Sequence, residues 1–181
     1  MAVPTLQEAV NFIVWAARVL ERPLPIFYVE LKRLKTHRSL CNDRSFEARL
    51  IKAFADLGVG SKNLIYQSFD RGPLEVLRRL HVKANATVPP LVHTLYRGAA
   101  HSLNHDVAVS YCDGVAPPFD VLLADRTWTE RARAAGLFTH VYTLNRDWLP
   151  GGFTSTAETL AFFEKMGIDG IFADYVQDVV A

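Results

Sequence analysis

The sequence is short of the features that mark membrane proteins or nucleic-acid binders. Its formal net charge is only +1 over 181 residues, so it offers no strong field to nucleic acid or to an anionic membrane surface. No apolar run approaches the roughly 20 residues that a membrane-spanning helix needs. The sequence does not open on a basic segment followed by an apolar one, so no signal peptide is predicted at its start.

Cysteine is scarce as well. The chain has 2 cysteines, Cys41 and Cys112, whose spacing does not fit a metal-binding motif. Two free thiols are one interpretation, and a single disulfide in an oxidising compartment is the other. The sequence alone leaves this choice open.

Hydrophobic residues, by contrast, make up 50% of the chain, which includes 11 Phe, 6 Tyr and 3 Trp. A chain of this length can bury about 70% of its unfolded surface around one core. We therefore expect a single domain over residues 1–181.

Helix signals recur along the chain. Thr5 and Glu8 have the spacing of a capping box, and apolar residues follow at helical spacing up to Leu20. Thr127 with Glu130 and Ser155 with Glu158 predict helix starts in the same way. Two further helices are predicted from Ser45 to Gly58, and from about Pro73 onward.

Short apolar runs alternate with these helices. They are "PIFYVELK", "NLIYQSF", "PLVHTLY", "DVAVSYC", "FTHVYTLN" and "DGIFAD", and each has the length and composition of a strand. The segments from His81 to Pro90 and from Arg97 to Pro118 are predicted to be mainly long loops. The alternation is typical of βα units that build a parallel sheet.

Two short motifs are better explained by local structure than by chemistry. "GVGSKN" at residues 58–63 follows a helix and precedes a strand, which is the wrong order for a phosphate-binding loop. We interpret it as a helix stop and a turn. "HSLNH" spaces two histidines as a zinc site would, but it lacks the glutamate of a metalloprotease and is expected on the surface.

The run "FYVELKRL" places Glu30 and Lys32 on one face of a predicted strand. They form either a solvated ion pair on an edge strand or the floor of an active site, because buried charges are costly unless paired or metal-bound. Other predicted strands also end in polar residues: Gln67 to Asp70, Tyr142 to Asn145, and Asp174 with Tyr175. The carboxyl ends of parallel strands share one rim, which favours the active-site interpretation.

Five segments together resemble the glycerophosphodiester phosphodiesterase family. "FYVELK" is similar to that family's third-strand V-E-[IL]-K motif, and "LIYQSFD" followed by "LEVLRRL" to its fourth strand and helix. "AAGLFTHVYTLNRD" resembles its seventh unit, and "MGIDGIFADY" its G-x-D-G-[IL]-x-[TS]-D-[FY] ending. "PTLQEAV" resembles its P-T-L-E-E-A segment. The motifs follow the family's order over nearly the whole chain.

This resemblance implies a (β/α)8 barrel of the TIM type, present here as an incomplete barrel of about six βα units. It implies hydrolysis of glycerophosphodiesters to an alcohol and glycerol 3-phosphate with a calcium or magnesium ion as cofactor. By the same match Glu30 is a metal ligand, Lys32 lies beside the phosphate, and Phe69 and Tyr142 line the substrate pocket. Oxygen ligands suit both of these hard cations.

The family's opening H-R-G and P-E-N-T motifs and its second-strand E-x-D pair have no counterpart here, so the first two strands are expected to be missing. The resemblance assigns those segments two metal ligands and the histidines that serve as general acid and base. None of this chain's histidines matches them, and no catalytic residue is therefore assigned. We expect the isolated chain to be inactive, with unpaired barrel edges that invite self-association.

Two alternatives remain open. The chain is either part of a hydrolase or a non-catalytic barrel remnant that binds a partner or completes a barrel in trans. A third chemistry, in which Lys32 forms a Schiff base as in aldolases, is also considered. The "VYTLN" and "IFADY" segments resemble the periplasmic or secreted branch of the family. That location is expected only if a signal peptide lies in the missing part.

Overall fold

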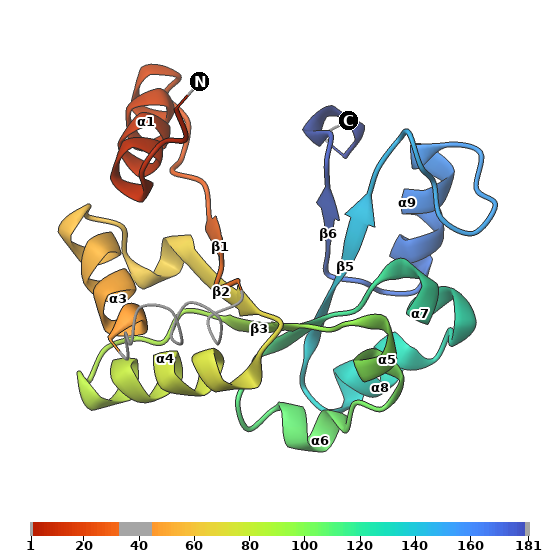
Figure 1. The fold of residues 1–181 in the computed structure, drawn as a ribbon. Helices are drawn as coiled ribbons and strands as arrows, with labels where there is room; N and C mark the ends of the chain where they lie inside the picture. Colours follow the sequence, from red (N-terminus) through yellow and green to blue (C-terminus); the bar gives the residue numbers. More distant parts are fainter. Residues whose placement is uncertain (1, 33–44, 180–181) are drawn as a thin grey trace.

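Six parallel strands follow one another around a curved sheet in the order in which they occur along the chain (Figure 1). The computed structural model describes residues 2–32 and 45–179. The strands are β1 (Phe27–Glu30), β2 (Leu64–Ser68), β3 (Leu91–Thr94), β4 (Gly114–Ala116), β5 (Phe138–Leu144) and β6 (Gly170–Ala173). Within the described residues β1 pairs only with β2, and β6 only with β5. The fold is an incomplete TIM-type barrel, as the sequence predicted.

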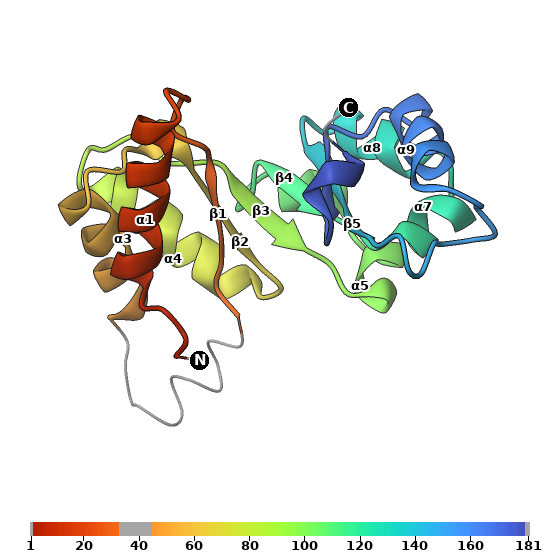
Figure 2. The same ribbon diagram turned by 90° about the horizontal axis from the view of Figure 1, so that it is seen from above.

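Helices alternate with the strands and lie on the outside of the curved sheet (Figure 2). The longer ones are α1 (Leu6–Val19), α3 (Phe46–Asp56), α4 (Arg71–Lys83) and α9 (Thr156–Lys165). The shorter ones are α5 (Arg97–His101), α6 (His105–Ala108), α7 (Phe119–Ala124) and α8 (Trp128–Ala134), with 3-10 turns η1 (Ser61–Asn63) and η2 (Val176–Asp178). None of the described helices combines the length and the apolar character needed to cross a membrane.

The predicted helix caps are confirmed only in part. Thr5 and Glu8 form a complete capping box at the start of α1. Ser155 accepts a hydrogen bond from the Glu158 backbone N–H, as predicted at the start of α9. At α8, however, the Thr127 side chain makes no capping bond. Its hydroxyl donates to the upstream Asp125 carboxylate instead, because a local side-chain acceptor competes with the cap.

The prediction of a long loop from Arg97 to Pro118, with a strand at "DVAVSYC", is wrong. This segment contains α5, α6 and β4. Asn104 caps α6 by accepting from the Val107 backbone N–H, and this bond places the start of the supposed strand in a helix. The true strand is only three residues long and consists of small residues, so its apolar signal is weak.

Two packed layers stabilise the sheet. The outer layer lies between sheet and helices, where Tyr66, Leu91 and Val115 belong to one buried cluster with residues of α3, α4 and α7. The inner layer lies inside the barrel. There the Tyr28 hydroxyl and His140 Nδ1 are 2.9 Å apart, joining β1 to β5 across the interior.

The inner layer depends on glycine. A Cβ on Gly114 would lie 2.2 Å from the Phe138 ring, and a Cβ on Gly170 would lie 2.7 Å from the His140 ring. Side chains at these two positions would therefore occupy the space of the aromatic rings of β5. The rings of β5 thus fill the space that side chains at Gly114 and Gly170 would otherwise occupy. Such alternation of large and small residues is typical of the interior of a small barrel.

Cys112 is buried as a free thiol. Burial raises the pKa of this thiol to about 12, so it is protonated and unreactive at neutral pH. Cys41, the other member of the disulfide considered above, lies outside the described residues.

We predict that Gly114→Ala lowers the free energy of unfolding by about 1–3 kcal/mol, because the added methyl group displaces the Phe138 ring from its packed position. Urea denaturation followed by circular dichroism measures the change. Gly72→Ala is the matched control. It lies in the first turn of α4 with nothing within 4 Å of its Cβ. Equal unfolding midpoints for the two variants would contradict the packing role of Gly114.

Candidate functional site

Polar side chains form a layer inside the barrel at the carboxyl ends of the strands. Glu30 follows the interior residue Tyr28 by two positions on β1, so both point to the same face. Gln67 is the register partner of Glu30 on β2. Its side-chain oxygen accepts a hydrogen bond of 3.1 Å from the Thr94 hydroxyl of β3. This layer, which we call the rim, is where a parallel barrel presents its chemistry.

Glu30 and Lys32 form an ion pair at the rim. Lys32 Nζ lies 3.7 Å from Glu30 Oε1, and the two side chains are 67% and 28% exposed respectively. The distance is too long for a hydrogen bond, and the pair lies on an edge strand. The sequence left two interpretations of this pair, a solvated ion pair on an edge strand or the floor of an active site. The exposure of both side chains is that of a solvated ion pair. The pair lies at the carboxyl end of β1, the end at which parallel barrels carry their active sites.

Three aromatic side chains gather at the rim from three segments. The Phe69 ring, just after β2, stacks on the Tyr96 ring with centroids 4.4 Å apart. It also meets the edge of the Tyr142 ring of β5 at 6.1 Å. The Tyr142 hydroxyl donates to the Leu95 backbone oxygen at 2.7 Å. This bond fixes the Tyr142 ring against the end of β3.

A cavity of about 930 Å³ opens beside Tyr142. Arg97 and Asp120 form an ion pair in its lining. Asn145 and Asp174 also line the cavity, and Asn145 donates to the Asp174 carboxylate at 2.8 Å. The cavity therefore has both apolar walls and charged groups, as expected of a site for a polar small molecule.

The surroundings of Tyr142 keep its hydroxyl protonated. Burial raises the pKa of Tyr142 to about 12, with Asp120 and Tyr96 acting in the same direction and Arg97 opposing them. Tyr142 is therefore a hydrogen-bond donor, and not a base, at neutral pH.

The structure brings together some of the residues that the sequence singled out. Phe69 and Tyr142 are in ring contact, and Glu30 and Lys32 are paired. Of these four residues, only Tyr142 lines the cavity described above. Sequence reasoning missed Tyr96, Arg97, Asp120 and Trp148, which also lie in the aromatic group or the cavity lining. Tyr96 is the last residue of the run "PLVHTLY" and Arg97 is the next, so their place at the end of a predicted strand was an available signal.

The donors in the described residues do not fit a divalent cation by themselves. In residues 2–32 and 45–179, no group of three or more His, Cys, Asp or Glu side chains gathers closely enough to hold a metal ion. Glu30 thus offers one carboxylate, whereas calcium takes six to eight oxygen ligands and magnesium six.

Four histidines of the described segments have surroundings other than the Glu30–Lys32 pair. His81 and His105 lie in helices, and His93 contacts the Tyr111 hydroxyl on the outer side of β3. His140 contacts Tyr28 in the middle of the barrel, and burial lowers its pKa. No hydrogen bond in the described part of the chain connects a histidine to the Glu30–Lys32 pair.

Comparisons with known proteins agree with this architecture. The sequence profile of the Glycerophosphoryl diester phosphodiesterase family matches residues 1–178. A structure from Silicibacter pomeroyi DSS-3, assigned as a glycerophosphoryl diester phosphodiesterase, gives a TM-score of 0.71 at 19% identity. A glycerophosphodiester phosphodiesterase from Parabacteroides distasonis gives 0.65 at 16%. A protein from Galdieria sulphuraria assigned to the same activity gives 0.64 at 18%. A search among curated proteins found no match.

These structural matches cover nearly all of this chain but only part of each neighbour. They cover 97%, 94% and 96% of this chain, against 55%, 60% and 61% of the neighbours in the same order. At such low identities the structures support the fold alone. From the coverages of the neighbours, the chain spans somewhat more than half the length of these proteins.

We predict that the free energy of unfolding falls as the pH rises from about 10 to about 12, and that Tyr142→Phe reduces this slope. Tyrosine ionises near pH 10 in the unfolded chain, whereas folding raises the pKa of Tyr142 to about 12. The stabilisation that the protonated Tyr142 hydroxyl gives to the folded state is thus complete below pH 10 and is lost as the pH approaches 12. Below pH 10 the variant should be less stable by about 1 kcal/mol, because the Leu95 oxygen loses its donor. Urea titrations at several pH values test this. Parallel curves for the two proteins would contradict it.

Proposed function

The chain belongs to the Glycerophosphoryl diester phosphodiesterase family, and from this premise we propose that it forms the substrate-binding part of a phosphoric diester hydrolase. The reaction would cleave a glycerophosphodiester to an alcohol and glycerol 3-phosphate. The family match over residues 1–178 carries the proposal. The placement of a carboxylate, an ammonium group and an aromatic cluster at the carboxyl ends of the strands supports it.

Lys32 is proposed to bind the phosphate. Its side chain is 67% exposed, and its 3.7 Å ion pair with Glu30 leaves the ammonium free to turn toward a second anion. A phosphodiester carries one negative charge, which a lysine ammonium neutralises while donating a charge-assisted hydrogen bond. The contact would be salt-sensitive, because the site is open to solvent.

Phe69 and Tyr142 are proposed to line the place of the glycerol or the head group. Their rings meet edge to face, and the Tyr96 ring stacks on the Phe69 ring. Such a group presents a rigid apolar wall to the carbon chain of a glycerol unit. The Tyr142 hydroxyl is engaged by the Leu95 oxygen, so we assign its ring, and not its hydroxyl, to binding.

Glu30 is proposed as one ligand of a calcium or magnesium ion. The described donors do not complete a cation site, so the remaining oxygen ligands would come from outside them. The general acid and base are likewise not assigned within this chain. We therefore expect the isolated chain to bind a glycerophosphodiester without hydrolysing it.

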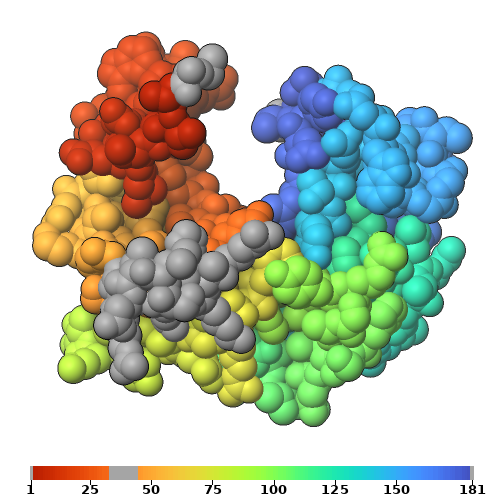
Figure 3. All heavy atoms as spheres, viewed as in Figure 1, coloured from red at the N-terminus to blue at the C-terminus, as the bar shows by residue number. Residues whose placement is uncertain are grey.

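A second candidate function is that of a barrel remnant that completes a site in trans. It is favoured by the open notch between the segments of α1 with β1 and of β5 with β6 (Figure 3). Helix α1 packs inward through Val10 and exposes Phe12, Trp15 and Val19 by 64%, 58% and 59%. Unpaired strand edges beside an apolar helix face are features that pairing with another chain would cover.

We predict that glycerol 3-phosphate binds to the purified chain and that Lys32→Met weakens this binding by about tenfold, the effect of losing one charge-assisted hydrogen bond. Isothermal titration calorimetry at low salt measures it. Lys52→Met is the control, because Lys52 is an equally exposed lysine that pairs with Asp56 on α3. If both variants bind as the parent does, or if the parent does not bind, the assignment of Lys32 is wrong.

We predict that the purified chain releases no glycerol 3-phosphate from glycerophosphocholine, with calcium, with magnesium or with a chelator. The assay is run on fractions separated by size-exclusion chromatography with light scattering. Metal-dependent turnover by a monomer that Glu30→Gln abolishes would overturn our view that the acid and base lie outside this chain. Turnover confined to a self-associated fraction would favour the second candidate function.

A further inference from the structure

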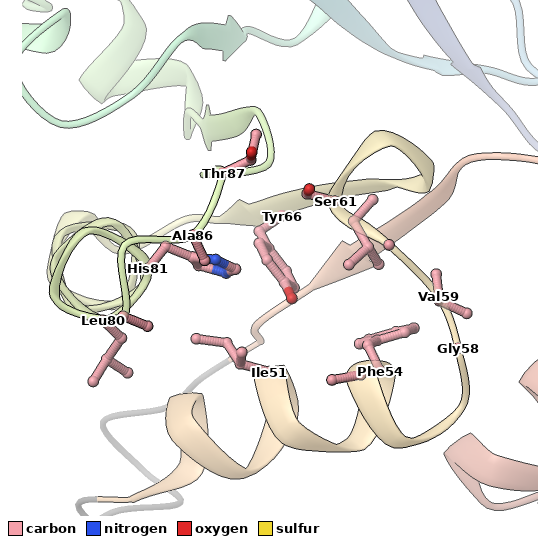
Figure 4. Close-up of a pocket in the computed structure, with 14 residues that line it drawn as sticks. Ile51, Phe54, Gly58, Val59, Ser61, Tyr66, Leu80, His81, Ala86 and Thr87 are labelled. Atoms are coloured by element: carbon pink, nitrogen blue, oxygen red, sulfur yellow. The ribbon is translucent and has the colours of Figure 1, made fainter.

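A second cavity lies at the opposite end of the strands from the rim. It has a volume of about 350 Å³ and lies between α3, α4 and β2 (Figure 4). Residues 58–61, just before β2, and Ala86 and Thr87, just before β3, form its mouth. These loops precede the strands, so this α3–α4 pocket lies at the amino end of the sheet. It is separate from the proposed catalytic rim.

Two buried polar atoms in this pocket have no hydrogen-bond partner among the described residues. They are the hydroxyl oxygen of Tyr66 and Nε2 of His81. Tyr66 is 0% exposed and His81 is 7% exposed. Figure 4 shows the His81 ring directed toward the Tyr66 ring, with ring centroids 6.2 Å apart, and the Tyr66 hydroxyl directed toward α3. An unsatisfied buried polar group is costly, so such atoms usually have a partner.

The remaining wall is apolar and uncharged. Ile51 and Phe54 of α3 form one side, and Leu80 of α4 lies near His81 (Figure 4). The residues that line the pocket include no Lys, Arg, Asp or Glu. An anion would find no countercharge here, because burial keeps His81 neutral by lowering its pKa. The same burial raises the pKa of Tyr66 to about 12, so its hydroxyl keeps its proton.

We propose that the α3–α4 pocket binds a small neutral molecule with an apolar ring and one hydroxyl group, a phenol being the simplest example. The ring would lie against Ile51, Phe54 and Leu80, and the hydroxyl would lie between Tyr66 and His81. A hydroxyl group both accepts and donates, so it can accept from the Tyr66 hydroxyl and donate to His81 Nε2. One ligand group thereby satisfies both unpartnered atoms.

The site is independent of the proposed hydrolase function. Along β2 the Tyr66 side chain faces the helices, whereas its neighbour Gln67 faces the barrel interior. Glycerol 3-phosphate is excluded from the pocket by its charge. Binding of the neutral ligand can therefore be measured with no reference to phosphodiester cleavage.

The test compares phenol with benzene, which has the same ring without the hydroxyl. Each is titrated into the full 181-residue chain and followed by ¹H–¹⁵N NMR of the amides of α3 and α4. We expect saturable shifts around the pocket, and phenol to bind about tenfold more tightly than benzene, the effect of one to two neutral hydrogen bonds. Equal affinities, or no saturable binding of phenol, would overturn the proposal.

Tyr66→Phe isolates the hydroxyl. The variant should fold, because the group that it removes has no partner among the described residues, and it should bind phenol no better than benzene. Tyr175→Phe is the matched control. It removes an exposed tyrosine hydroxyl at the carboxyl end of the sheet, so it should keep the preference for phenol. Loss of the preference in both variants, or in neither, would contradict the site.

Ala86→Leu provides a second variant that leaves both polar atoms in place. Ala86 is an exposed residue that lines the mouth of the pocket, so a larger side chain there should weaken phenol and benzene alike without threatening the core. Unchanged binding of both compounds would place them elsewhere on the protein and would overturn the proposal.

Discussion

The contact between Tyr28, His140 and Phe172 inside the barrel is the interaction on which the rest of this structure depends. In the part of the chain that the structure describes, β1 and β6 are not paired with each other, so no backbone hydrogen bond holds these two edges in a common curve. Here the Tyr28 hydroxyl meets His140 Nδ1 at 2.9 Å, and its ring meets the Phe172 ring at 4.9 Å. Strand β1 is thereby fixed against β5 and β6 by side chains alone. Burial raises the pKa of Tyr28 and lowers that of His140, so both groups are neutral in this contact.

This inner layer also determines where the polar rim lies. Side chains alternate along a strand, so the residues two positions after Tyr28 and His140 point into the same space, one layer higher. Those residues are Glu30 and Tyr142. The hydrogen bond from Tyr142 to the Leu95 oxygen then fixes the upper layer from the side of β3. The candidate site is thus held by packing below it and by hydrogen bonds within it, from Tyr142 to the Leu95 oxygen and from Thr94 to Gln67.

The sequence predicted most of this architecture because the longer elements carry strong local signals. The capping box at Thr5 and the apolar run around Val29 depend only on neighbours in the chain. The short strand Gly114–Ala116 escaped prediction because its identity depends on the Phe138 ring that occupies the space above Gly114. Gly114 is small for a reason that lies on another strand. Periodicity within a single segment cannot contain that information.

For the candidate site, too, residues with a local sequence signal were predicted and contacts between distant segments were not. Each of Glu30, Lys32, Phe69 and Tyr142 lies at the end of a recognisable strand or next to one, and the resemblance to the family's motifs selected them from the other residues there. The stacking of Tyr96 on Phe69 was not, because Tyr96 follows a neighbouring strand and meets Phe69 only through the register of the sheet.

Strand β2 shows how one short segment can serve two different chemistries. Gln67 joins the polar layer inside the barrel, whereas Tyr66 points outward to the uncharged pocket beneath α3 and α4. Successive side chains on a strand face opposite ways, so the two residues contact different surroundings although they are adjacent in sequence. Of these two sites, only the rim has charged side chains, which suits a phosphate ester. The outer pocket offers two neutral hydrogen-bonding atoms in an apolar wall. A ligand suited to one of these environments is therefore unsuited to the other.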